Sequence, residues 1–473
     1  MLGLLGTLNL ASRSLQTQMT GVEVAGQNLA NINTTGYTRQ SVEIQTSPDI
    51  STTIGPEGTG ANAVAIQQVV NAILNNQIQS QQSTSGYWSA QQTALQSAQT
   101  SLNEFLNGTG SATSSSTNST TDTGLSGQLS SLFADFQSVA TSPTSISARQ
   151  QLISDAQTLA ATFNQINTQL DTSRTTLNTS LGNDVDSANK LLSGIADLNK
   201  QISTADFNGA TPNDLLDERE QDLENLSNLT NITTSTGTNG AVDVSIGGQS
   251  LVSGNQVLDT IQTYDAGGGQ LLVQTATGGV NLTLTGGSMQ GTIDARDGEL
   301  ATMQSSINTL ASTLITQVNT IHSGGFNLTG TNGANFFNGS DAATITVNAA
   351  LASNPSLFQA SGSATANSDN SVARQLADLA STAQSGLNNQ TFSDSYGQTV
   401  AALGDSLQTA NDQVNNQTAV TNMLSTQRGS VSGVNVDEEM TNLMSFQRAY
   451  EASAQLVTTL NTMLGDVLAM KTS

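Results

Sequence analysis

The chain opens with the stretch Met1-LGLLGTLNLASRSLQTQMTGVEVAGQN-Leu29, in which apolar side chains recur at intervals of three and four residues. A stripe with a mean period of about 3.5 residues stays on one side of an α-helix over many turns. A lone helix cannot bury such a stripe, so the stripe needs a partner surface. The members of this N-terminal stripe are Met1, Leu5, Leu8, Leu15, Met19, Val22 and Leu29.

The other end of the chain carries a second stripe with the same spacing. Its members are Leu443, Phe446, Tyr450, Val457, Leu460, Leu464 and Val467. Only Ser12, Gly26 and Ser453 interrupt the two stripes. Both ends therefore predict long helices, and we expect the two helices to pair as a coiled coil.

The composition excludes several kinds of partner. The 473 residues include 36 acidic and 12 basic side chains, for a formal net charge of -24. Phosphate binding needs clustered Lys and Arg, and here they are scattered, so we expect no nucleic acid and no anionic membrane surface as a partner. Only 10% of the residues are charged, against roughly a quarter in ordinary globular chains. A polar, weakly charged surface should tolerate close packing between copies.

The sequence offers no familiar targeting signal. It contains no cysteine, so disulfides and thiolate metal sites are not possible. The first residues lack a preceding Lys or Arg and are interrupted by Gly and polar residues, which makes a poor secretion signal. No window approaches the roughly 18 continuous apolar residues of a membrane span, so we expect no membrane insertion. If the protein leaves the cell, it needs a route that reads no cleaved leader.

The first half of the chain is predicted to be mostly helical. We expect a helix to about residue 33, a break at Gly36, a strand over 37–45, a turn-rich loop to residue 58 and a helix over 64–106. The Ser/Thr/Gly tract from Gly108 to Gly124 is predicted as a flexible loop. Helical patterning resumes over 125–229, with breaks near Pro143, Gly182 and 209–212.

The second half begins with a β-type pattern. Short runs such as Ala241–Ile246 and Gln270–Gln274, separated by Gly and Asn, predict strands over 232–287. A helix over 291–321, a strand over 343–347 and helices from about residue 371 onward follow. The fold class is therefore mainly α with an inserted small β domain. The predicted division is a terminal coiled-coil domain (1–35 plus 433–473), a mainly helical bundle domain (36–230 plus 291–432) and a β-rich domain (231–290).

Two patterns that could carry chemistry have simpler structural explanations. His322 is the only histidine, so a catalytic triad or a His-ligated metal would depend on it. It stands before Gly324 and Gly325, where a helix should end, and a polar residue in the last helical turn is the better interpretation. Gly58–Ala63 fits G-x-G-x-x-A but follows a Pro/Gly loop, so we expect a turn and no nucleotide site.

The acidic clusters are interpreted in the same way. Asp214–Glu224 holds six carboxylates interleaved with leucines at helical spacing, which predicts the solvated face of an amphipathic helix rather than a glycosidase pair. Asp437–Glu439 opens the last helix, where negative charge meets the positive end of the helix dipole, and Asn435 with Glu438 fits a capping box. We therefore expect no catalytic, cofactor-binding or metal-binding residues and no cofactor.

Both ends of the chain also resemble a known family. The segment Gln27-NLANINTTGYT-Arg39 is similar to the N-terminal signature of the flagellar axial proteins, which comprise rod, hook and hook-associated proteins. The run Ser432–Gln455 resembles their C-terminal signature. Asn31 suits a helix end, and Gly36 permits a positive φ at the turn into the strand. The signature residues carried over are Asn28, Leu29, Ala30, Asn31, Gly36, Tyr37 and Arg39.

Three internal stretches favour the hook-associated proteins over the hook and rod proteins. They are Asn213–Arg219, Gly291–Asp297, and Val318–Gly330 with Phe336 and Phe337. Because the β region is short, we expect an outer domain carried by longer relatives to be absent.

The resemblance implies a non-enzymatic structural subunit of the bacterial flagellum, in the ring between hook and filament, exported unfolded by the flagellar type III apparatus without leader cleavage. It implies that the paired ends form an inner domain lining the axial channel, that the bundle forms the next shell and that the β domain faces outward. The two stripes then become the assembly interface, and the terminal helices are expected to fold only on assembly. The implied partners are further copies of the chain, the hook protein, a second junction protein (hook-associated protein 3) and an export chaperone at the C-terminal helix.

Two alternative functions stay open. Another axial subunit, such as a hook or distal rod protein, would share both end signatures but lack the internal stretches. A peptidoglycan hydrolase travelling with the rod would need an acidic pair in a cleft of its own domain, and the sequence contains no recognisable module of that kind.

Overall fold

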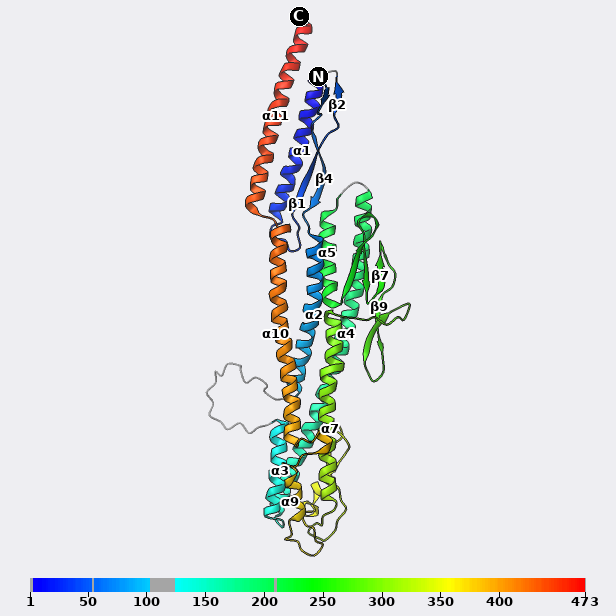
Figure 1. Cartoon of the computed structure of the whole chain (residues 1–473), viewed down its shortest axis with the longest axis vertical. Coiled ribbons are helices and arrows are strands. Elements are labelled where there is room, and N and C mark those ends of the chain that lie inside the picture. The colour runs from blue at the N-terminus through cyan, green and yellow to red at the C-terminus, as the bar shows by residue number, and fades with distance from the viewer. Residues whose placement is uncertain (1–2, 53–54, 103–123, 208–210, 473) are drawn as a thin grey trace.

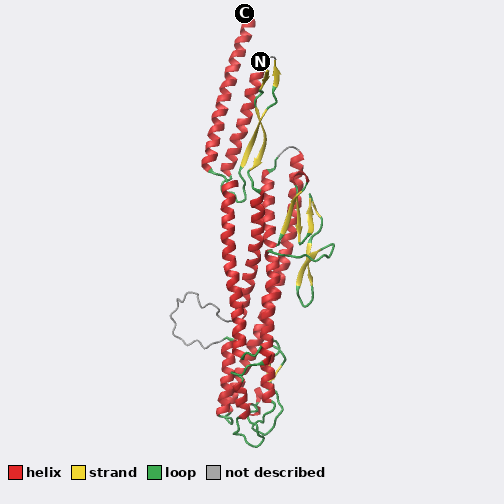
Figure 2. Cartoon of the chain, viewed as in Figure 1, coloured by secondary structure: helices red, strands yellow, loops and turns green. Residues whose placement is uncertain are grey.

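The protein is a long, narrow molecule whose two ends lie together. In the computed structural model, the chain runs away from one tip through helices and returns to it, so that the N- and C-terminal helices lie side by side (Figure 1). The structure describes residues 3–52, 55–102, 124–207 and 211–472. Helices dominate, and strands gather beside the terminal helices and on one flank of the bundle (Figure 2). The predicted fold class is confirmed.

Two antiparallel helices and a long β-hairpin form the terminal region. The helices are α1 (Leu4–Ala30) and α11 (Val436–Thr472). The hairpin pairs β1 (Gln40–Thr46) with β4 (Ala61–Gln68), and beyond it β2 (Ile50–Thr52) pairs with β3 (Gly55–Glu57). α1 lies between α11 and the β1–β4 hairpin and contacts both.

The prediction of a helix over 64–106 was wrong for its first residues. β4 occupies Ala61–Gln68, and α2 spans only Ala72–Leu102. α2 begins after Asn71, because the Asn71 Oδ1 accepts hydrogen bonds from the backbone N–H groups of Ile73 (3.1 Å) and Leu74 (3.2 Å). A short apolar run does not distinguish strand from helix, and pairing with β1 decided it. Residues 103–106 of the predicted helix lie outside the described part of the chain.

Long helices form the bundle. They are α2, α3 (Leu125–Thr141), α4 (Ile146–Phe207), α5 (Asn213–Leu229), α7 (Ala301–His322) and α10 (Phe392–Ser432). α3 ends just before Pro143 as predicted, but the break predicted at Gly182 is wrong, since α4 continues through it. Leu181 and Val185 beside it are buried, which outweighs the roughly 1 kcal/mol that glycine costs inside a helix. The predicted flexible loop from Gly108 lies outside the described residues, except for Gly124 at the start of α3.

The strands predicted between residues 232 and 287 pack against the side of α4. β5 (Ile232–Thr236), β6 (Val242–Ile246), β7 (Gln249–Ser253) and β8 (Gln256–Val257) form an antiparallel sheet in that order, and β9 (Ile261–Asp265) pairs with β10 (Leu271–Thr275). Val244 and Ile246 share a hydrophobic core with Leu192 and Ile195 of α4. The β region is therefore attached to the bundle along one helix.

An irregular helix leads from the β region back into the bundle. α6 (Gly287–Asp294) continues through a π-helical turn, Ala295–Leu300, into α7. In that turn the fully buried Arg296 pairs with Asp297 (2.6 Å) and donates to Asn178 Oδ1 of α4 (2.6 Å) and to the Leu271 carbonyl of β10 (2.7 Å). This guanidinium ties the β9–β10 hairpin to the bundle.

A large aromatic core fills the end of the bundle far from the termini. Phe136 of α3 lies 5.7 Å from Phe336 and 6.2 Å from Phe358, measured between ring centroids. The strand predicted over 343–347 is shorter than expected, because only Thr346–Val347 pairs, with Phe337–Asn338. The short elements of this end are β11 (Phe337–Asn338), β12 (Thr346–Val347), α8 (Ala349–Ser353), α9 (Ser371–Asp378) and the 3-10 turns Pro355–Leu357 and Ser385–Leu387. A further 3-10 turn, Thr238–Gly240, joins β5 to β6.

Candidate assembly interface

The antiparallel pairing of α1 with α11 brings the two ends of the chain together (Figure 1). The hydroxyls of Ser14 and Ser453 lie 2.9 Å apart. Gly21 lies so close to the ring of Phe446 that a Cβ atom on Gly21 would be 2.6 Å from it. The prediction that the terminal helices pack together is confirmed.

Most of the predicted stripe of α11 lies on the side that packs. Leu460 is buried, and Leu443, Phe446, Val457 and Leu464 are half-buried. The two other members are exposed, Tyr450 by 40% and Val467 by 54%.

α1 packs with a different face from the predicted one. Its buried residues are Ala11, Thr17, Gly21, Val24, Ala25 and Asn28. In the predicted stripe Leu8, Leu15, Val22 and Leu29 are half-buried, whereas Leu5 is 68% and Met19 is 54% exposed; Met1 lies outside the described residues. Leu5 and Met19, like Tyr450 and Val467 of α11, therefore do not pack within the chain, and their place in the assembly interface stays a prediction.

Small side chains explain the choice of face on α1. They allow a close approach on two sides, to Phe446 at Gly21 and to β4 at Thr17, whose Oγ1 donates to the Ala61 carbonyl (3.1 Å). The signal in the sequence is a run of small residues at helical spacing, namely Ser14, Thr17 and Gly21, which a search for large apolar residues passes over.

Apolar side chains remain exposed along the helix pair. Besides the exposed members of the two stripes, the large apolar side chains that α11 exposes include Met440, Met444, Leu456 and Met463. Extended apolar patches of this kind mark interaction sites on soluble proteins. The pair therefore presents a surface suited to further protein.

The signature segment builds the connection between α1 and β1. Asn28 is fully buried; its Nδ2 donates to the Gln40 carbonyl (2.8 Å), and its Oδ1 accepts from the Gln40 N–H (2.9 Å) and from the Tyr37 hydroxyl (2.9 Å). Asn31 ends α1, and Gly36 has a φ of 82°, as the sequence predicted. The remaining signature residues, Leu29 and Ala30, form the last turn of α1.

Arg39 joins this connection to the start of α11. Its N–H donates to the Ser432 carbonyl (2.8 Å), and its guanidinium pairs with Glu438 (2.5 Å). The predicted helix start is present, because the Asn435 Oδ1 accepts from the N–H groups of Asp437 (2.9 Å) and Glu438 (3.3 Å). The Glu438 side chain, expected to complete a capping box, contacts Arg39 instead.

Only part of the acidic cluster of α5 is the solvated face that we predicted, because Asp214 and Glu218 are exposed and the other four carboxylates are not. Asp217 is half-buried and accepts hydrogen bonds from the Thr38 N–H (3.0 Å) and the Gln68 side chain (2.8 Å). Glu224 is buried and pairs with Arg428 of α10. The carboxylates therefore join the terminal region, α5 and α10. They were misjudged because their partners lie far away along the chain.

Burial where the terminal region meets α5 shifts the pKa values of Asp217 and Tyr37. Burial raises the pKa of Asp217, while the hydrogen bonds from Thr38 and Gln68 oppose that rise. Burial, followed by the charges of Asp214, Asp217 and Glu439, raises the pKa of Tyr37 to about 12. Tyr37 therefore keeps its proton near neutral pH and remains a hydrogen-bond donor to Asn28.

His322 is a structural residue at the last position of α7. Its Nδ1 lies 2.8 Å from the Ala334 carbonyl, and its Nε2 accepts from the Gln359 N–H (3.0 Å). Its ring packs 5.1 Å from that of Phe358, and burial lowers its pKa to about 4. The neutral imidazole holds two loops against the aromatic core, which agrees with the structural interpretation.

The remaining candidate sites have structural roles as well. In Gly58–Ala63 the first three residues form the turn between β3 and β4, with a φ of 107° at Gly60, and the last three begin β4. Among the described residues, no three His, Asp or Glu side chains gather so as to hold a metal ion. None of the helices in the described ranges has the length and apolar character needed to cross a bilayer.

Two protein-family models match the chain. The flagellar hook-associated protein FlgK helical domain matches residues 111–337, and the flagellar basal body rod FlgEFG protein C-terminal region matches residues 430–470. The first match covers much of the bundle and the whole β region, and the second covers nearly all of α11.

Relatives match along nearly the whole chain. Flagellar hook-associated protein 1 of Bacillus subtilis is 28% identical over 509 positions, covering 98% of this chain and 97% of the relative. The protein of the same name from Escherichia coli is 25% identical over 549 positions, covering 96% and 97%. Both alignments are longer than this chain, so these relatives carry segments that it lacks.

A solved structure shares the fold. The flagellar hook junction protein FlgK from Burkholderia pseudomallei superposes with a TM-score of 0.62 at 19% identity, covering 76% of this chain and all of that one.

Proposed function

The chain belongs to the hook-associated branch of the flagellar axial proteins, and we propose that it is a structural subunit of the bacterial flagellum that forms the hook–filament junction ring next to the hook. The observation that carries this proposal is the similarity to hook-associated protein 1 along 96–98% of the chain. The exposed apolar surface of the terminal helix pair supports an assembling subunit rather than a freely diffusing one.

We assign two roles to the residues of the predicted interface. Phe446 and Leu460, with the half-buried members of the α11 stripe, hold α11 against α1 within one chain. The exposed members contact neighbouring subunits, where each would lose apolar surface to a partner. These exposed members are Leu5, Met19, Tyr450 and Val467.

In this proposal the three parts of the chain lie at different depths of the flagellum. The terminal region (1–35 plus 433–473) is the inner domain, and the β1–β4 hairpin accompanies it because it packs on α1. The rest of the predicted bundle domain (36–230 plus 291–432, without that hairpin) forms the next shell, and the β region (231–290) faces outward. The hydrogen bonds from the Thr38 N–H to Asp217 of α5 and from the Arg39 N–H to the Ser432 carbonyl of α10 hold the inner part on the bundle.

The proposed partners follow from the same position. Further copies complete the ring, the hook protein lies on one side, and the second junction protein, hook-associated protein 3, lies on the filament side. The chain reaches the cell exterior through the flagellar export apparatus without leader cleavage, and an export chaperone covers the C-terminal helix beforehand. The full chain should pull down this chaperone, and a chain lacking residues 440–473 should not.

Isolated hooks provide the direct test of the proposed function. Purified protein added to hooks from a deletion strain should bind their distal ends as a single layer and allow filament growth after the next proteins are added. The double variant Leu5→Glu, Met19→Glu should bind much more weakly, because it places charge on the proposed contact. Phe207→Glu is the matched control, since Phe207 is 89% exposed and belongs to α4 rather than to α1 or α11.

Other outcomes would assign other functions. Polymerisation into long tubes on the hook would indicate a hook or rod subunit, the alternative that the C-terminal match to rod proteins favours. Clearing of cell wall by the purified protein would indicate the peptidoglycan hydrolase. Absence of hook binding by the unmodified chain would contradict the junction proposal.

We also propose that the terminal helices order only during assembly. Their apolar surface needs neighbours, and an isolated helix pair of this kind is marginal in water. In the purified monomer, amide hydrogens within residues 1–30 and 440–470 should exchange rapidly, and those of α4 slowly. Strong protection of both terminal segments in the monomer would contradict this proposal.

A further inference from the structure

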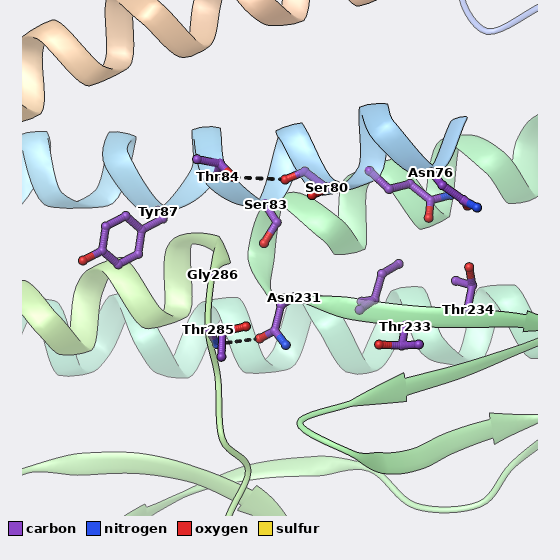
Figure 3. Close-up of a pocket in the computed structure, with 12 residues that line it drawn as sticks. Asn76, Ser80, Ser83, Thr84, Tyr87, Asn231, Thr233, Thr234, Thr285 and Gly286 are labelled. Atoms are coloured by element: carbon purple, nitrogen blue, oxygen red, sulfur yellow. Dashed lines mark hydrogen bonds between the residues drawn. The ribbon is translucent and has the colours of Figure 1, made fainter. Parts of the chain in front are cut away.

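β5 is an edge strand with open space beside it. It pairs with β6 on one side only, because it comes first in the sheet order β5-β6-β7-β8. On its other side, a cavity of about 450 Å³ separates it from α2 (Figure 3). An edge strand beside open space offers its backbone groups to another strand.

Hydrogen bonds on β6 reveal which way the backbone groups of β5 point. The Asn199 side chain occupies both backbone groups of Val242, donating to the carbonyl (2.8 Å) and accepting from the N–H (3.1 Å). Backbone groups alternate in direction along a strand, so Ala241 and Asp243 direct theirs toward β5. The bond from the Gly237 N–H to the Ala241 carbonyl (2.8 Å) agrees with this assignment.

The same alternation identifies the outer edge of β5. Thr233 and Ser235 lie opposite Ser245 and Asp243 in the register, so they bond to β6. The intervening residues turn their N–H and C=O groups outward, and within the described ranges the structure shows no hydrogen-bond partner for these groups. At about 3.4 Å per residue, this edge spans about 14 Å, the length of a short strand. The outward-facing residues are Ile232, Thr234 and Thr236.

The cavity is lined by uncharged polar groups. Figure 3 shows side chains of α2 facing those of β5 and the segment before it across the space. Among the residues that the structure describes, none with a charged side chain lines the cavity. Tyr87 at one end already donates its hydroxyl to Asp294 (3.0 Å). The polar side chains that line the space include those of Asn76, Ser80, Ser83, Asn231, Thr233 and Thr234.

We propose that a second copy of this chain places an extended, uncharged segment in this groove and adds a strand to the outer edge of β5. Main-chain hydrogen bonds to Ile232, Thr234 and Thr236 would supply the affinity, as in other cases of strand addition. The inference rests on the proposed function, which provides neighbouring copies.

Charge favours a second copy as the occupant. A charged side chain entering the groove would lose hydration without gaining an ionic partner. Only 10% of the residues of this chain are charged, so it contains many segments of Ser, Thr, Asn and Gly whose groups match the lining. A typical globular partner, with roughly a quarter of its residues charged, offers fewer such segments.

A peptide array tests the inference with the full-length protein. Overlapping ten-residue peptides covering this sequence, and a second set covering the hook protein, are probed with labelled protein, and the strongest binder is measured in solution by fluorescence anisotropy. Peptides of this chain that are free of charge should bind. Hydrogen exchange should then show protection of the Ile232, Thr234 and Thr236 amides only when peptide is present.

Two variants separate backbone pairing from side-chain contact. Thr234→Pro removes an outward N–H, which an edge strand tolerates, and should weaken peptide binding about tenfold. Thr234→Val keeps the N–H and the branched shape and should bind like the unmodified protein. Methylating alternate backbone nitrogens of the peptide removes its donors without altering the protein, and should abolish binding even if Thr234→Pro does not fold.

Failure of this inference is distinguishable from failure of the proposed function. Absence of any bound peptide, binding confined to hook-protein peptides, or binding unaffected by peptide methylation would overturn the inference, whatever the hook-binding result. Conversely, strand addition measured with peptides would stand even if the protein did not bind hooks.

Discussion

Replacing Arg296 with methionine should destabilise the protein and loosen the β9–β10 hairpin. The buried guanidinium pairs with Asp297 and donates to Asn178 and to the Leu271 carbonyl, and methionine removes these donors at similar length. Breaking a buried ion pair by removing one partner costs about 3–5 kcal/mol. The Asp297 side chain is 25% exposed, so water compensates it in part, and we expect a cost at the lower end, about 3 kcal/mol.

Thermal unfolding followed by circular dichroism measures this cost. Unfolding 473 residues changes the entropy by about 1 kcal/mol/K, so a loss of about 3 kcal/mol should lower Tm by about 3 °C. Hydrogen exchange should show faster exchange in Ile261–Thr275, while the aromatic core around Phe136 stays protected. Arg374→Met is the matched control, because Arg374 is exposed and its loss should leave Tm unchanged. An unchanged Tm and unchanged exchange in Arg296→Met would refute the reasoning.

Three further substitutions test other parts of the structure. In hook-bound protein, Gly21→Leu should prevent close packing of α1 on Phe446 and lower the yield of a disulfide engineered at Ser14 and Ser453. Gly26→Leu should not, because a Cβ at Gly26 meets nothing within 4 Å; equal yields would contradict the packing argument. Burial lowers the pKa of His322 to about 4, so below about pH 6.5 the folded state binds fewer protons than the unfolded state. The contribution of His322 to stability should be constant above about pH 6.5 and fall by up to about 1.4 kcal/mol per pH unit toward pH 4. His322→Gln should flatten that part of a Tm-against-pH curve, and an unchanged slope would show that other groups cause it. Burial, and then nearby Asp155, raises the pKa of Asp135 to about 7. Ionisation of Asp135 therefore lowers the stability of the folded protein as pH rises from about 4 to 7. Asp135→Asn should stabilise the protein by about 1 kcal/mol at pH 8, allowing for solvent screening, but not at pH 4. A gain that is the same at both pH values would contradict this assignment.

The two terminal helices differ in how well the sequence predicted their packing. α11 packs through large apolar residues such as Phe446 and Leu460, which stand out at their spacing. α1 packs through Ala11, Ser14 and Gly21, which carry little hydrophobic signal because their role is to let other atoms come close. The large residues Leu5 and Met19 on the same helix are exposed and do not take part in this packing.

The acidic cluster of α5 and the strand β4 depended on remote partners. Asp217 accepts a hydrogen bond from the N–H of Thr38, which lies 179 residues away along the chain. Glu224 pairs with Arg428, which lies 204 residues away. β4 became a strand because β1 lies beside it. The local sequence pattern holds no information about such distant neighbours. It therefore predicted a solvated helix face for the acidic cluster and a helix for the residues of β4.

The sequence by itself determined that the chain is mainly helical, that its ends pair, that strands interrupt it after residue 232 and that it resembles hook-associated flagellar proteins. These features depend on side-chain periodicity and short motifs, which are local. Only the tertiary structure decided which face of α1 is buried, how Thr38, Arg39 and Asp217 join the terminal region to the bundle, and which edge of β5 is open. These depend on close approach between segments hundreds of residues apart, where the fit of individual atoms, rather than average hydrophobicity, selects the contact.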